Sequence, residues 1–263
     1  MQELMRRVRA KFYKWTERKL RIPIEPLVKT ERLGSPYGGW IVPENWFDRH
    51  SICYLVGAGE DISFDLALVA RYQSRAWIID PTPRAENHFE RWKNQTEIGQ
   101  PGECSTCPGG HYPPFPADLI GQITFCPVGL WNEDTTLRFF APRNEAYVSH
   151  SLVNLQRSEK HIEVPVKKLG TLMKELGHPR INLLKIDVEG AEYQVLEAML
   201  ADNIEVDVLC IEYDETASNH LDGAYITRIE HSLQSLIQAG FRVIARESNC
   251  HNYTLVHQRR LRS

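Results

Sequence analysis

The chain has 263 residues, of which 42% are hydrophobic and 25% are charged. This length and composition exclude a disulfide-dependent mini-protein, a coiled coil and a disordered chain, and predict one large or two small globular domains. The formal net charge is −3, but residues 1–21 carry eight basic side chains against Glu3 and Glu17, so the rest of the chain is acidic. An acidic body argues against a nucleic-acid enzyme, whose binding face needs clustered Lys and Arg.

The N-terminal segment combines basic residues with an apolar stripe, which predicts an amphipathic helix that ends before Pro23. Its apolar side chains recur at helical spacing: Leu4, Val8, Phe12 and Trp15. Two interpretations stay open, since such a helix can pack on its own domain or dock, as residues 1–21, on an anionic membrane surface or a partner protein. Residues 22–50 are rich in Pro, Gly and aromatic residues and predict a connector or lid. We therefore expect residues 1–50 to form a helix and lid on one catalytic domain, residues 51–263.

No apolar run approaches the roughly 18 residues that cross a bilayer, and the basic N-terminus lacks the apolar core of a signal peptide. The expected location is the cytoplasm, where thiols stay reduced, with peripheral membrane contact as the alternative.

Cys104 and Cys107, with His111 four residues later, have the spacing of half a zinc site. We expect unpaired thiols in a loop there, with structural zinc and a labile disulfide as alternatives, and no metal in the catalytic site.

From residue 51 onward, short apolar runs alternate with helical periods, which predicts a mostly parallel sheet with helices on both faces. The last two strands are joined by only six residues, so they are expected to form an antiparallel hairpin. Residues 94–122 contain five prolines and no helical or strand period, which predicts an inserted loop. The expected strands are 52–56, 76–80, 123–130, 182–187, 207–213, 241–246 and 253–257, with a strand-turn segment at 136–140. The expected helices lie near 61–72, 84–93, 169–176, 190–200 and 225–239.

The first strand runs into a glycine turn formed by Gly57 and Gly59, the place where a doubly wound sheet binds a nucleotide-like ligand. The third glycine of a dinucleotide fingerprint is absent, and Glu60 and Asp61 would repel a diphosphate. The same carboxylates suit a cationic ligand with an adenosine and no phosphate, which describes S-adenosylmethionine. Asp80 ends the second strand, where a carboxylate can accept both ribose hydroxyls, although a turn-forming Asp is the alternative.

A second acidic cluster follows a buried strand, in the run KIDVEGAEYQVLEAML that begins at Lys185. Together with GAGEDISFD and DPTP, this run resembles the FkbM-type methyltransferases, a branch of the class I S-adenosylmethionine-dependent fold. The likeness covers roughly residues 34 to 257. It implies a Rossmann-like sheet of seven strands, S-adenosylmethionine as methyl donor, and mostly O-methylation of hydroxyls on sugars or polyketides.

The resemblance also implies which residues meet the cofactor. Gly57 and Gly59 correspond to the cofactor loop, and Asp80 corresponds to the ribose ligand. The run 125–131 corresponds to the family's third strand, whose end lies beside the adenine, so we expect Val128 to contact the cofactor.

On the acceptor side, the resemblance places Asp187 and Glu189 as the acidic pair at the end of the fourth strand, and Glu212 as the fifth-strand acid that faces the acceptor. We expect Glu189 and Tyr213 to bind the acceptor. Methyl transfer needs an in-line approach of an oxygen to the sulfonium methyl, aided by a base. The catalytic candidates are Asp187, Glu212 and His150, although Asp187 could instead cap the next helix and His150 could be a surface histidine.

The segment from Tyr37 to Trp40 lies just before the first strand and contains two glycines between its aromatic rings. Aromatic faces favour a sulfonium cation and exclude water, so we expect both rings to close over the cofactor. The alternative is that Trp40 plugs the core between connector and domain.

The sequence thus predicts an S-adenosylmethionine-dependent methyltransferase acting on a small molecule or glycan. A methyltransferase-fold binding module without catalysis, docking through the basic helix, and an NAD-dependent oxidoreductase are the two alternatives. The identity of the acceptor and the oligomeric state are not predicted.

Overall fold

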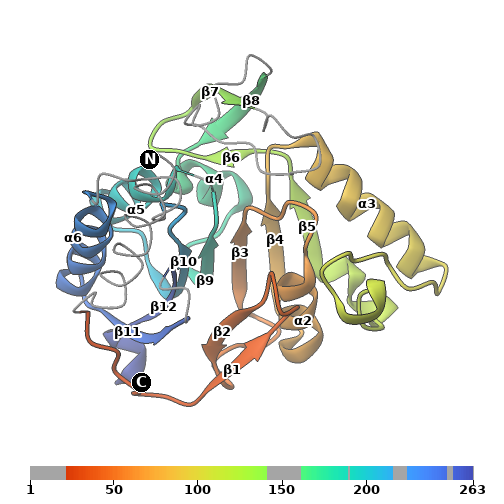
Figure 1. Ribbon diagram of the computed structural model, residues 1–263, viewed down its shortest axis with the longest axis horizontal. Helices are drawn as coiled ribbons and strands as arrows, with labels where there is room; N and C mark the ends of the chain where they lie inside the picture. Colours follow the sequence, from red (N-terminus) through yellow and green to blue (C-terminus); the bar gives the residue numbers. More distant parts are fainter. Residues whose placement is uncertain (1–21, 141–160, 189, 216–223, 248–250, 263) are drawn as a thin grey trace, which may run out of the picture.

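The computed structural model describes residues 22–140, 161–188, 190–215, 224–247 and 251–262. The predicted N-terminal helix, His150 and Glu189 lie outside these residues. Within the described part, a central sheet is covered by helices on both faces (Figure 1). None of the helices described there has the length and apolar character to span a membrane.

The central sheet contains the seven strands expected from the apolar runs, in the order β11-β12-β10-β9-β3-β4-β5. Neighbouring strands are parallel except β12, which pairs antiparallel with both β10 and β11. A parallel body with an antiparallel C-terminal hairpin confirms the predicted fold class. The strands are β3 (Ile52–Val56), β4 (Arg75–Ile79), β5 (Ile123–Cys126), β9 (Ile181–Ile186), β10 (Val206–Glu212), β11 (Phe241–Arg246) and β12 (Asn252–His257).

Each face of the sheet builds its own core, because successive side chains of a strand point to opposite faces. In β3, Tyr54 and Val56 join one core, whereas Cys53 and Leu55 join the other. Three helices cover the first core: α4 (Leu169–Leu176), α5 (Glu192–Ala201) and α6 (Ala224–Gln238). Two helices cover the second: α2 (Ser63–Tyr72) and α3 (Pro83–Glu97).

Residues expected to be only a connector or lid contain an antiparallel hairpin of β1 (Thr30–Leu33) and β2 (Trp40–Pro43). The hairpin is tied to the sheet, since Thr254 donates a hydrogen bond to the carbonyl of Ile41 at 2.6 Å. Trp40 is 2% exposed and lies in the second core. The prediction that Trp40 closes over the cofactor is therefore wrong, and its ring is a core plug.

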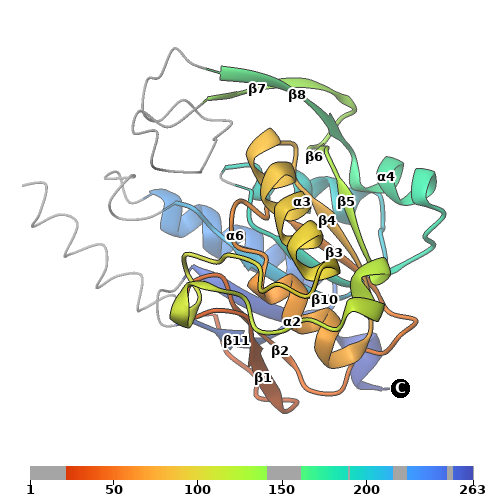
Figure 2. The ribbon, with the colours of Figure 1, turned by 90° about the vertical axis from the view of Figure 1, so that its right-hand side faces the viewer.

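A second sheet, in the order β6-β8-β7, consists of β6 (Gly129–Leu130), β7 (Thr135–Phe140) and β8 (His161–Lys167). Figure 2 shows β7 and β8 projecting away from the central sheet. The strand expected at 123–130 is split between β5 and β6, because Pro127 lacks the N–H that a continuous strand needs. The expected insert begins as the last turn of α3 and continues through two short 3-10 helices, η1 (Pro108–Gly110) and η2 (Ala117–Gln122).

Candidate active site

A cavity of about 280 Å³ lies at the carboxyl ends of β3, β4 and β9. These are the ends where an open α/β sheet binds its ligands, and β3 is the strand from which the order runs out in both directions. The glycine turn after β3, the acidic ends of β4 and β9, and residues of β6 and β7 form its walls. The topology thus brings together the acidic motifs that the sequence places far apart.

Gly57 is the residue at which the turn passes closest to β9. Its φ is +80°, and a Cβ atom there would lie 1.6 Å from the carbonyl oxygen of Asp187, so only glycine fits. Gly59 has a φ of +53° but open space around it. Glycine is therefore favoured at this position only by the backbone angle. Both glycines line the cavity, as expected for a cofactor loop.

Asp80 lies at the end of β4 with its carboxylate buried against the glycine turn. Its Oδ2 accepts hydrogen bonds from the N–H groups of Ala58 and Gly59, each at 3.0 Å. Its Oδ1 accepts from the N–H and the hydroxyl of Thr82, at 2.8 and 2.6 Å. Asp80 lines the cavity, but each oxygen already holds two donors, so the carboxylate shapes the turn. Its contact with ribose stays a prediction.

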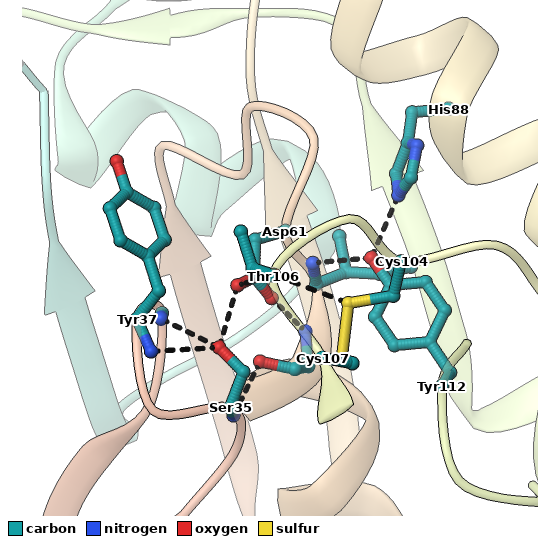
Figure 3. Close-up of a disulfide and its surroundings, with 11 residues drawn as sticks. Ser35, Tyr37, Asp61, His88, Cys104, Thr106, Cys107 and Tyr112 are labelled. Atoms are coloured by element: carbon teal, nitrogen blue, oxygen red, sulfur yellow. Dashed lines mark hydrogen bonds between the residues drawn. A yellow bond between two sulfur atoms is a disulfide. The ribbon is translucent and has the colours of Figure 1, made fainter. Parts of the chain in front are cut away.

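Asp61 joins three separate segments through one carboxylate (Figure 3). It accepts hydrogen bonds from the hydroxyls of Ser35 and Thr106, at 2.8 and 2.5 Å, and from the N–H of Ser63 at 2.8 Å. Burial alone would raise the pKa of Asp61, but these hydrogen bonds outweigh it and lower the pKa. Asp61 therefore remains ionised at the cavity wall.

Glu60, the other predicted acid of the turn, also lines the cavity. Arg84 of α3 donates to its carboxylate at 2.7 Å, and Arg91 lies 3.9 Å away. The hydrogen bond from Arg84 lowers the pKa of Glu60 against the opposing effect of partial burial. Glu60 is thus a charged residue held by the helix after β4.

Lys185 is a site residue that the sequence reasoning missed. Its ammonium donates to the carbonyl of Gly57 at 2.5 Å and lies 3.2 Å from Asp187 Oδ2. Burial alone would lower the pKa of Lys185, but the carboxylates of Asp187 and Asp65 outweigh it and raise the pKa. A lysine inside the apolar run Leu-Leu-Lys-Ile is the available signal, since a buried ammonium requires ionic partners.

Two predicted cofactor contacts have different outcomes. Tyr37 is 80% exposed and lines the cavity, and the hydroxyl of Ser35 holds its N–H at 3.2 Å. Val128 is buried in the first core and is absent from the cavity lining, whereas its neighbours Gly129 and Leu130 form part of the wall. The cavity lining thus favours the residue after Val128 for the predicted position, and the contact of Val128 with the cofactor stays a prediction.

On the acceptor side, Asp187 lines the cavity with its side chain about one third exposed. Glu212 ends β10 outside this cavity lining and accepts a hydrogen bond from Asn252 at 3.1 Å. Tyr213 is fully buried, packs against Tyr253 and donates to Ser232 at 2.9 Å. The prediction that Tyr213 binds the acceptor is therefore wrong, because its ring faces the core.

The insert contributes Ser105 and Thr106 to the cavity wall, and a disulfide joins Cys104 to Cys107 around them (Figure 3). The expectation of unpaired thiols is wrong. Of the alternatives considered, the structure has the disulfide, and among the described residues no group of three or more His, Cys, Asp or Glu side chains is placed to hold a metal.

Comparison with known proteins agrees with this geometry. The methyltransferase FkbM domain matches residues 55–243 of the chain. Methyltransferase 1 of Beauveria bassiana (strain ARSEF 2860) is 28% identical over 174 residues, which are 59% of this chain and 64% of that protein, so the chain spans less than two thirds of this relative.

The crystal structure of methyltransferase FkbM from Methylobacillus flagellatus KT superposes with a TM-score of 0.45 at 13% identity. That match covers 80% of this chain and 44% of the other. Since the FkbM domain spans most of the chain, this protein belongs to the FkbM methyltransferase family.

Proposed function

We propose that this methyltransferase uses S-adenosylmethionine and methylates a hydroxyl group on a sugar, a glycan or another small-molecule natural product. The observation that carries the proposal is the excess of carboxylates in the lining of the cavity, beside a glycine turn where four N–H groups already donate to oxygens of the chain.

The charge of the cavity favours a cationic ligand. Its lining includes the carboxylates of Glu60, Asp61, Asp80 and Asp187 against the ammonium of Lys185, and Glu60 is also paired with Arg84 of α3. A cavity with this excess of negative charge attracts a sulfonium and an α-ammonium group and disfavours a diphosphate. This supports S-adenosylmethionine over a nicotinamide dinucleotide.

A pyrophosphate would use open N–H donors at such a turn, whereas four N–H groups before and at the start of α2 donate to oxygens of the chain itself. The N–H groups of Ala58 and Gly59 both donate to Asp80. The N–H of Ile62 donates to the hydroxyl of Tyr112 at 3.1 Å, and the N–H of Ser63 donates to Asp61. These four N–H groups are thus engaged by the chain's own oxygens, which argues against the oxidoreductase alternative.

The described residues fit S-adenosylmethionine by their chemistry. When bound, the cofactor supplies an electrophilic methyl group on a sulfonium. The glycine turn, shaped by Asp80, would hold its adenosine, and the exposed ring of Tyr37 would cover it and exclude water. Asp187 would orient the acceptor hydroxyl or take its proton, with Lys185 fixing the position of the carboxylate.

Calorimetric titration with S-adenosylmethionine, S-adenosylhomocysteine and NAD⁺ tests the cofactor. We expect binding of the first two ligands and none of NAD⁺. Transfer of a labelled methyl group to a panel of hydroxylated sugars then tests the reaction. Binding of NAD⁺ alone would favour the oxidoreductase, and binding of S-adenosylmethionine without transfer to any acceptor would favour the non-catalytic module.

A further inference from the structure

We infer that Thr106 is a positioning residue for the glycine turn of the proposed cofactor site, and that the Cys104–Cys107 disulfide holds Thr106 in place. Cofactor affinity therefore depends on the redox state of these two cysteines. The inference rests on the proposed use of S-adenosylmethionine. It adds to that proposal that one wall of the cofactor site keeps its position only while the disulfide is intact.

The first observation is the contact between the disulfide loop and the turn. Thr106 donates its hydroxyl to Asp61 Oδ2 at 2.5 Å, and Asp61 follows directly after the turn residues that line the cavity. The same Asp61 oxygen accepts from Ser35, whose hydroxyl in turn accepts from the N–H of Gly38 at 2.8 Å. The hydrogen bond from Thr106 therefore connects the disulfide loop to the turn through Asp61, and to the segment that carries Tyr37 through Asp61 and Ser35 (Figure 3).

The second observation is that the disulfide fixes the loop that carries Thr106. It closes a four-residue loop whose ends are also joined by a backbone hydrogen bond from the N–H of Cys107 to the carbonyl of Cys104 at 3.3 Å. The N–H of Cys104 donates to the carbonyl of Gly110 at 2.9 Å, which connects the loop to the end of η1. The sulfur of Cys104 lies 3.2 Å from the hydroxyl of Thr106. The disulfide thus restricts the backbone on both sides of Thr106 and contacts its side chain directly.

The loop also forms part of two adjoining hollows. Ser105 and Thr106 line the cofactor cavity, whereas Ser105 and Cys104 line a neighbouring hollow of about 390 Å³ between α3 and the insert. The second hollow offers a small dithiol a route toward the disulfide. Cys104 is fully buried and Cys107 is 7% exposed, so reduction requires the loop to open slightly.

The reaction is thiol–disulfide exchange with a dithiol reductant. A thiolate of the reductant attacks one cysteine sulfur, the protein S–S bond breaks, and a mixed disulfide forms. The second thiol of the reductant then displaces the other cysteine, which leaves two cysteine thiols and a cyclic disulfide in the reductant. Two electrons and two protons pass to the protein. The freed loop loses its fixed position against Asp61.

The redox part is tested by calorimetric titration of S-adenosylmethionine into the full chain, oxidised or treated with dithiothreitol. We expect reduction to weaken binding about threefold to tenfold, the range of one lost hydrogen bond. The double variant Cys104→Ser, Cys107→Ser should bind like the reduced protein and stop responding to dithiothreitol. This variant separates the effect from the free cysteines that the structure describes, Cys53, Cys126 and Cys210, and from Cys250, which lies outside the described residues.

The positioning part is tested with Thr106→Val in the oxidised protein. We expect a raised KM for S-adenosylmethionine with kcat unchanged, and recovery in Thr106→Ser, which restores the hydroxyl. Thr124→Val, at an exposed threonine of β5, is the matched control. A merely structural role would lower the thermal midpoint of unfolding in Thr106→Val and leave KM unaltered.

Equal affinity of the oxidised and reduced proteins would overturn the inference and leave the proposed function standing. Alkylation of both cysteines in protein never exposed to reductant would also overturn it. If neither redox state binds S-adenosylmethionine, the proposed function fails, and the inference fails with it.

Discussion

The buried ammonium of Lys185 lies 3.2 Å from a carboxylate oxygen of Asp187. The same ammonium donates to the carbonyl of Gly57, so one side chain fixes both the glycine turn and the carboxylate proposed to meet the acceptor. Asp65, buried in the first turn of α2, also raises the pKa of Lys185. The glycine turn, the end of β9 and the first turn of α2 therefore all interact with the one positive charge of Lys185.

Replacing Lys185 with Met should lower the free energy of unfolding by about 3–5 kcal/mol, the usual cost of removing one partner from a buried ion pair. The variant leaves the carboxylates of Asp65 and Asp187 without their cation. Urea unfolding at pH 7.5 measures the effect.

A double variant, Lys185→Met with Asp65→Asn, supplies the control. Because the second change removes a carboxylate that the first leaves uncompensated, it should recover part of the lost stability. Strictly additive losses would show that Asp65 and Lys185 do not interact, and a loss below about 1 kcal/mol in Lys185→Met would contradict the buried ion pair.

Asp187→Asn tests the role of the cavity carboxylate in catalysis. We expect affinity for S-adenosylmethionine to stay within about tenfold of the parent, while turnover falls about 100-fold, because the amide cannot accept the hydroxyl proton. Labelled methyl transfer gives kcat and calorimetry gives Kd. The exposed Asp118→Asn is the control. Near-normal turnover would reduce Asp187 to a structural partner of Lys185.

The central strands were predictable because each is a short apolar run bounded by Gly, Pro or charged residues, and that pattern is local. The β1–β2 hairpin was not, since its strands have four residues each and depend on distant contacts such as Thr254 with Ile41. The grouping of the acids was also predictable. Each acid directly follows an apolar run, and parallel strands all end at the same edge of the sheet.

The direction of single side chains was harder to predict. Trp40 and Tyr213 have the right chain positions but face the core, since only the packing of the neighbouring elements decides which way they point. The spacing of Cys104 and Cys107 favours unpaired thiols on sequence grounds but is also compatible with zinc or a disulfide, and only the fold brings the two sulfurs together. The hydrogen bonds that occupy Asp61 and Asp80 come from segments that the sequence gives no reason to pair.

Tyr37 and Trp40, which the sequence predicts to close together over the cofactor, should behave differently when they are replaced. Trp40→Ala should lower the free energy of unfolding by about 3–5 kcal/mol, because it empties a buried site. Tyr37→Ala should change stability by less than about 0.5 kcal/mol, because the ring is exposed, yet weaken binding of S-adenosylmethionine. Thermal unfolding with and without cofactor distinguishes them, and unchanged affinity in Tyr37→Ala would end the lid hypothesis.

Asp80→Asn should weaken S-adenosylmethionine binding by about 1.5–3 kcal/mol, because an amide nitrogen cannot accept the hydrogen bonds that shape the glycine turn. Calorimetry measures the change, and circular dichroism checks that the fold persists. Glu86→Gln, at an exposed acid in the first turn of α3, is the control. Unchanged affinity in a folded Asp80→Asn variant would remove this carboxylate from the site.

Asp65 should make the stability of the fold depend on pH. It is 2% exposed, and its Oδ1 has no hydrogen-bond partner among the described residues. Burial raises the pKa of Asp65 to about 6, with Lys185 opposing the shift. An unfolded Asp titrates near pH 4, so between about pH 4 and 6 the native state keeps a proton that the unfolded chain loses.

The free energy of unfolding should therefore fall by about 3 kcal/mol as the pH rises through this window, and this contribution should be flat above it. Asp65→Asn stays neutral at every pH, so this part of the decline should disappear, whereas Asp118→Asn should retain it. Urea unfolding of the three proteins from pH 4.5 to 7.5 tests the difference. The test is whether the difference in free energy of unfolding between the parent and Asp65→Asn changes with pH. A difference that is the same at every pH reports only the altered packing at position 65. Parallel curves for Asp65→Asn and the parent would show that Asp65 is ionised throughout, stabilised by Lys185 more strongly than burial opposes it.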